Sequence, residues 1–166
     1  MQSICINKLT TQGPEIIGQF PSDFFKNGEL TEVPMKAMPL NAKEGDFTTI
    51  LFRDNLMIIT YIFTLQEEEG TRPSLLSLSA ALDDTKINPF SFKELFGSII
   101  EQLKNLELAD TDFIVSLLPQ LYQSLTAGKS EIRITKTVSI KIEFNGDIAP
   151  PEQKKKKKVD KSKGMW

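Results

Sequence analysis

Residues that could do chemistry are few in this chain, and they lie far apart. The sequence has no histidine, one cysteine (Cys5) and three arginines, one of which is Arg72. Without histidine, the commonest general base and metal ligand is missing. The segment Gly128-Lys129-Ser130 imitates the end of a phosphate-binding loop, but position 123 is glutamine where that motif needs glycine. The acidic runs at 67–69 and 83–84 lack the spacing of a calcium loop. We therefore expect no enzymatic activity, no cofactor and no metal.

Composition favours one folded domain with a charged tail. The chain has 166 residues, of which 40% are apolar, enough to build a core. The longest apolar run, 57–65, is far shorter than the roughly 20 residues that a membrane-crossing helix needs. Residues 150–166 hold seven lysines and two carboxylates, whereas the preceding 149 residues hold 13 basic and 20 acidic groups. An acidic body argues against nucleic-acid binding. The single cysteine, on an apolar strand, fits a core position in a cytoplasmic protein.

The elements that must position these residues follow from hydrophobic periodicity and turn signals. Two strands flank the turn Thr11-Gln12-Gly13-Pro14, and short helical turns follow it. Two long amphipathic stripes predict two helices, the first with a capping box from Ser91 to Glu94 and the second ending at Gly128. Pro119 should kink the second helix or restart it. The expected strands are 3–8, 15–20, 46–53, 56–66 and 73–82. The first long helix is expected to begin at about 91, and the second is expected to run from about 112 to 127.

The segment 131–144 has the strongest two-residue period in the chain, which predicts one long added strand. Lys136 falls on its apolar face, which suits an edge strand or a bend between two shorter strands. The apolar face needs a partner surface, either the sheet edge of its own domain or that of a partner chain. The candidate partner-binding residues are Ile132, Ile134, Val138, Ile140, Ile142 and Phe144.

The C-terminal segment 148–166 is predicted to be a disordered lysine-rich tail beyond a domain at 1–147. Such a cluster gains about 1 kcal/mol per lysine near an anionic membrane leaflet, and tryptophan favours the membrane interface. The tail is therefore either solvated or a peripheral membrane contact. Its candidate residues are Lys154, Lys155, Lys156, Lys157, Lys158, Lys161, Lys163 and Trp166.

Three short segments, in the order of the expected elements, resemble longin domains. They are Gly13-Pro14, Phe20-Pro21-Ser22-Asp23-Phe24 and Thr71-Arg72-Pro73-Ser74-Leu75-Leu76. The chain is most similar to the longin domains of nitrogen permease regulator and DENN-type proteins, over about three quarters of its length. The resemblance implies an α+β fold, with a five-stranded antiparallel sheet, one short helix on one face and two helices on the other. The added strand would extend it. Related domains occur in archaea, and the lysine- and isoleucine-rich composition suits such a source.

The resemblance also implies a function in membrane-trafficking-type regulation. The protein would be an adaptor that pairs with a longin or roadblock domain, itself included, and engages a small Ras-like GTPase. A first alternative is a GTPase-activating subunit, in which Arg72 would be an arginine finger that stabilises the phosphoryl transition state. Pro73 departs from that family pattern, because it stiffens a residue expected to move. A second alternative is a profilin-like actin binder, since profilins also pack helices on both faces of an antiparallel sheet.

Overall fold

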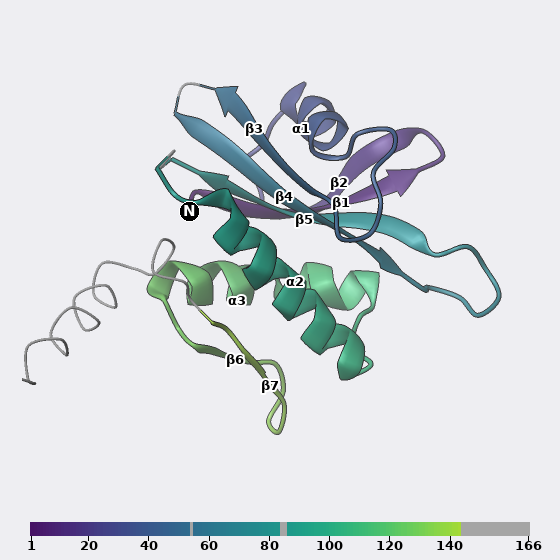
Figure 1. Cartoon of the computed structure of the whole chain (residues 1–166), viewed down its shortest axis with the longest axis vertical. Coiled ribbons are helices and arrows are strands. Elements are labelled where there is room, and N and C mark those ends of the chain that lie inside the picture. Colours follow the sequence, from purple (N-terminus) through teal and green to yellow (C-terminus); the bar gives the residue numbers. More distant parts are fainter. Residues whose placement is uncertain (54, 84–85, 144–166) are drawn as a thin grey trace, which may run out of the picture.

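A computed structural model describes residues 1–53, 55–83 and 86–143, and it forms an α+β sandwich (Figure 1). The chain begins with the hairpin of β1 and β2 and then forms the short helix α1. Three strands, two long helices and a small hairpin follow. The elements are β1 (Ser3–Thr10), β2 (Gly13–Phe20), α1 (Glu29–Ala37), β3 (Phe47–Arg53), β4 (Leu56–Leu65), β5 (Ser74–Leu82), α2 (Pro89–Asn105), α3 (Thr111–Ala127), β6 (Glu131–Arg133) and β7 (Ser139–Lys141).

The main sheet has the order β2-β1-β5-β4-β3, and all its pairs are antiparallel. Strand β4 is apolar at nearly every position and is an internal strand with both faces covered, as its sequence predicts. Among the described residues, β2 and β3 each have a sheet neighbour on one side only. The five-stranded sheet and its three helices confirm the predicted fold class.

The two faces of the sheet are covered unequally. Helices α2 and α3 pack on one face over a large aliphatic and aromatic cluster, and α1 covers part of the other face (Figure 1). The face under α1 is more polar. The Asn7 side chain donates to Ser77 Oγ at 2.9 Å and to Ser79 Oγ at 3.0 Å, and Thr60 shares a 2.8 Å hydrogen bond with Ser79. Within the described residues, the larger apolar core therefore lies between the sheet and the two long helices.

The ends of the long helices differ in part from expectation. Helix α2 begins at Pro89, and Asn88 accepts from the Phe90 amide at 3.1 Å, so the predicted capping role of Ser91 is wrong. Ser91 is buried instead. Helix α3 is capped by Asp110 and continues through Pro119 as one element. Gly128 ends it with a φ of 68°, as predicted.

The described part of the segment, 131–143, corrects the prediction of one long added strand and agrees with the alternative of a bend between two shorter strands. It forms the hairpin β6–β7, whose turn places Lys136 at the tip, and this hairpin packs on α2 and α3 (Figure 1). Gln102 of α2 donates to Lys141 O and accepts from its amide, both at 2.8 Å, and Gln120 of α3 donates to Arg133 O. Helices α2 and α3 thus supply hydrogen bonds that a neighbouring strand would otherwise have supplied.

Candidate functional site

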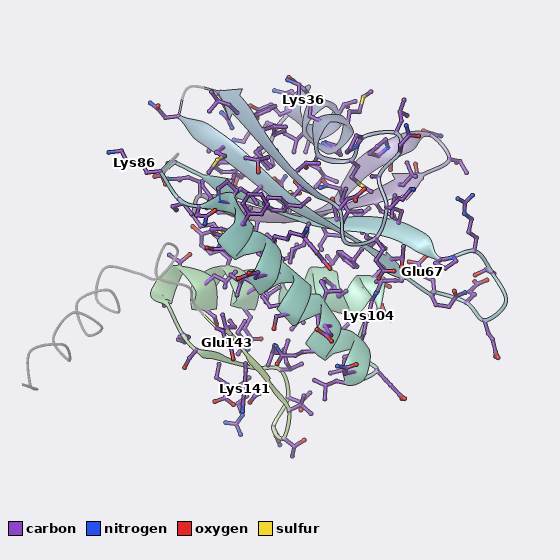
Figure 2. The ribbon with its side chains drawn as sticks, in the orientation of Figure 1. Lys36, Glu67, Lys86, Lys104, Lys141 and Glu143 are labelled. Carbon is purple, nitrogen blue, oxygen red and sulfur yellow. The ribbon has the colours of Figure 1, made fainter. Side chains whose placement is uncertain are left out.

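The isoleucines proposed for partner binding lie mostly in the protein's own core. Ile132, Ile140 and Ile142 are at most 3% exposed, where they cover the outer sides of α2 and α3. Ile134 and Val138 flank the hairpin turn and are partly buried. Ile132, Ile140 and Ile142 thus pack within the chain, as the intramolecular alternative describes, and partner binding through this segment stays a prediction. Phe144 and the proposed membrane-contact residues at 154–166 lie outside the described residues. Lys141 is visible on the hairpin beneath the helices (Figure 2).

Arg72 lies on the β4–β5 loop and is exposed. Its side chain makes no hydrogen bond or ion pair with another residue in the described part of the chain. Its role as an arginine finger stays a prediction.

Glu67, on the same loop, joins three elements. It accepts from Lys8 Nζ of β1 at 2.7 Å, from Ser74 Oγ at 2.5 Å and from Thr111 Oγ1 of α3 at 2.5 Å. These hydrogen bonds, chiefly the one from Lys8, lower the pKa of Glu67 to about 2. The carboxylate therefore ties the start of the β4–β5 loop (Figure 2) to β1, to Ser74 of β5 and to α3.

Cys5 is buried under α1 and is unsuited to act as a nucleophile. Burial raises the pKa of its thiol to about 12, although a hydrogen bond with Ser79 opposes the rise. A thiol needs a lowered pKa and solvent access to react. No group of three or more histidine, cysteine, aspartate or glutamate residues in the described ranges could hold a metal ion. None of the helices described here is long and apolar enough to cross a bilayer.

A groove of about 800 Å³ lies beside α2. We call it the β3–α2 groove. Tyr61 of β4 and Gly97 of α2 lie on its floor, and Phe90 at the start of α2 forms one wall. The Phe90 ring packs on Phe47 of β3, with the ring centroids 5.8 Å apart. Phe90 remains 66% exposed, so the groove presents aromatic surface to solvent.

One end of the β3–α2 groove is fixed by an ion pair. Glu44, before β3, binds Lys104 of α2 and accepts from Thr64 Oγ1 at 2.8 Å, and these partners, Lys104 first, lower its pKa. Burial, together with the negative charges of Glu44 and Glu101, raises the pKa of Tyr61. Tyr61 is thus a neutral hydroxyl in the groove floor, able to donate or accept a hydrogen bond.

The groove borders an open strand edge. Helix α2 packs against β4, and the next strand outward, β3, has no neighbour on its outer side within the described residues. On the α2 side β3 presents Phe47, Thr49 and Leu51, because they pair with Tyr61, Ile59 and Met57. Leu51 is 70% exposed. From Phe47 to Phe52 the strand carries no charge.

The other edge, β2, is poorly suited to strand pairing. It contains Pro14, which has no amide hydrogen, and the charged Glu15. Its register with β1 shifts in the middle of the strand, between Ile6 and Asn7. Bulges, charges and proline are the usual means by which proteins protect a sheet edge. The β3 edge has its register shift only at its end, after Leu51. The two edges therefore differ, and β3 is the open one.

Sequence reasoning missed the β3–α2 groove because it depends on which strands become edges. The sequence contains Phe90 at the groove and Leu51 on the neighbouring strand edge, but it does not show that these two large apolar side chains are exposed. No protein-family model matches the chain, and no curated protein matches it in sequence. The fold and groove define an α+β domain with an antiparallel sheet, helices on both faces and one unprotected edge.

Proposed function

We propose that this protein is a non-enzymatic adaptor subunit that pairs through the β3 edge with a second sheet-containing domain. The observation that carries the proposal is the contrast between a protected β2 edge and a β3 edge that is uncharged from Phe47 to Phe52 and regular up to Leu51. Unpaired amide and carbonyl groups on such an edge are satisfied when a partner adds a strand. Leu51 and the aromatic side of the β3–α2 groove would supply the apolar contact beside it.

The identity of the partner rests on the resemblance to longin domains. It suggests a longin or roadblock domain as the pairing partner, a second copy of this chain included, and a small Ras-like GTPase that the pair engages in the cytoplasm. Pairing with the seven residues of β3 alone would bury little surface compared with the roughly 1,000 Å² of a specific interface. The partner is therefore expected to cover the groove as well as the strand.

The test compares the full chain with a Leu51→Lys variant. A lysine on an edge strand opposes strand pairing, and since Leu51 is 70% exposed its replacement should change stability by less than about 0.5 kcal/mol. Leu106→Lys is the matched control, because Leu106 is 41% exposed and follows α2. Immobilised protein is incubated with lysate of the source organism, and bound proteins are identified by mass spectrometry and then purified for light scattering.

We expect a longin or roadblock protein, or the chain itself, to bind wild type and the Leu106→Lys variant but not Leu51→Lys. Retention of that partner by Leu51→Lys would refute pairing through β3. A chain that stays monomeric and captures no sheet-domain protein would refute the adaptor function itself.

A further inference from the structure

Helix α1 is too short to cover its face of the sheet. It has nine residues, which span about 14 Å at 1.5 Å per residue. Strand β4 has ten residues and spans roughly 33 Å. The apolar cluster with α1 uses Leu56 at the start of β4 and Ala81 near the end of β5. The opposite ends of these strands extend beyond α1 (Figure 1).

The uncovered part of this face forms a second hollow of about 690 Å³, which we call the distal groove. Its floor contains Leu9 of β1 and Leu75 of β5, and Leu40, from the connection between α1 and β3, lines its side. Leu9 is 46% exposed and Leu40 is fully exposed. The volume lies within the roughly 300–1,000 Å³ of ligand pockets. The distal groove shares only Glu44 with the β3–α2 groove.

The free charge that lines the distal groove is positive. Lys43 and Arg72 both line it, and in the described ranges neither side chain has an ion pair or hydrogen bond with another residue. Its one carboxylate, Glu44, is already held by Lys104 and Thr64. Two uncompensated cations beside exposed leucines therefore select for a ligand that has both aliphatic and anionic groups.

We propose that the distal groove binds a short, extended segment of a partner protein that carries aliphatic side chains flanked by aspartate or glutamate. The leucines would bury the aliphatic groups, and Lys43 and Arg72 would pair with the carboxylates. The chain's own lysine-rich C-terminal segment has the wrong sign of charge for this groove. A flat anionic membrane would also meet Glu68 and Glu69, exposed on the loop before Arg72, whereas a narrow peptide touches only the groove.

The test uses a fluorescent six-residue peptide of two leucines flanked on each side by two aspartates, titrated into the full chain. Fluorescence anisotropy gives the affinity, and amide shifts in NMR spectra locate the site. The Lys43→Glu/Arg72→Glu variant should weaken binding at least tenfold, about 1.4 kcal/mol. It should also prefer a peptide in which lysines replace the aspartates. Lys129→Glu is the matched control, since Lys129 is an exposed lysine after α3, and it should change affinity less than about twofold.

The Leu9→Ser/Leu40→Ser variant tests the apolar half of the site and should also weaken binding at least tenfold. Both double variants change exposed side chains, so unchanged circular dichroism and thermal midpoints will show that they fold. Equal binding of the acidic and basic peptides would overturn the proposal, as would equal losses in the Lys129→Glu and Lys43→Glu/Arg72→Glu variants. Absence of peptide binding at millimolar concentration would overturn it too, and so would Arg72-dependent binding to phosphatidylserine vesicles without peptide binding.

Discussion

Two glycines, Gly18 and Gly97, should respond in opposite directions to the same substitution by alanine. Gly18 lies on β2 beneath α3, and a Cβ atom there would stand 2.8 Å from Val115 Cγ1. Gly97 lies within α2 above Tyr61, and a Cβ atom there would stand 3.5 Å from the Tyr61 ring. The first distance is a clash with a stiff β-branched side chain, and the second is an ordinary contact.

The expected magnitudes follow from these distances. Overpacking costs about 1–3 kcal/mol, and alanine recovers roughly 0.5–1 kcal/mol relative to glycine inside an element. Gly18→Ala should therefore lower the free energy of unfolding by up to about 2.5 kcal/mol, whereas Gly97→Ala should raise it by roughly 0.5–1 kcal/mol. At 2–4 °C per kcal/mol for a chain of this size, thermal midpoints should move by several degrees in opposite directions.

Urea unfolding followed by circular dichroism measures both variants, and the Gly18→Ala/Val115→Ala variant identifies the clash. If Val115 is the obstacle, the double variant should be more stable than the sum of the single changes predicts, by about 0.5–3 kcal/mol. Additive effects would show that α3 does not press on β2 at Gly18. If Gly97→Ala instead lowers the free energy of unfolding, the floor of the β3–α2 groove has no room for a Cβ atom between Gly97 and Tyr61.

Two further predictions concern Glu67 and the β6–β7 hairpin. Because the folded pKa of Glu67 is about 2 against an ordinary value of 4.5, its stabilisation is present above pH 4.5 and is lost as the pH falls toward 2. Partial exposure reduces its size to about 1 kcal/mol. In urea unfolding, Glu67→Gln should thus lower the free energy of unfolding by that amount at pH 7 and by little near pH 2. The control Glu68→Gln should leave it unchanged at both pH values. Equal losses for Glu67→Gln at both pH values would contradict this link between pKa and stability. Ile140→Ala, at a fully buried position, should lower the free energy of unfolding by about 2–5 kcal/mol. This loss should be clearly larger than that of Val138→Ala at the hairpin turn. Equal urea midpoints for the two variants would show that the β6–β7 hairpin does not pack on the helices.

Much of the fold could be predicted because the signals are local. The apolar stripe that begins at Phe92 and the continuous apolar run of β4 each require a particular element, whatever the rest of the chain does. Gly128 was predicted to end the second long helix, and it does so with the left-handed φ typical of that position. The residue that caps α2 could not be predicted from such a local signal. Asn88 caps α2 because Pro89 and Phe90 join the helix, and this moves Ser91 into the first turn, where it is buried.

The 131–144 segment shows where a local pattern is insufficient. Alternation of apolar and polar residues is the same for one straight strand and for two strands folded at Lys136. Gln102 and Gln120 bind backbone groups of the folded-back segment, and these groups lie 39 and 13 residues away from them in the sequence. Such distant hydrogen-bond partners are invisible to periodicity. The β3–α2 groove was missed for the same reason, since β3 becomes an edge only when β4 pairs with β5.

Both proposed surfaces follow from the lengths and positions of three helices over five strands. Helices α2 and α3 leave β3 beyond Phe47 exposed on one face, and α1 leaves the far ends of β1, β4 and β5 uncovered on the other. Single exposed apolar side chains are normal on protein surfaces. Of the seven large exposed apolar residues in the described ranges, four lie at these two places, Leu51 and Phe90 at the β3 edge and its groove and Leu9 and Leu40 at the distal groove. It is this grouping, beside an open edge in one case and beside free cations in the other, that argues for binding at each.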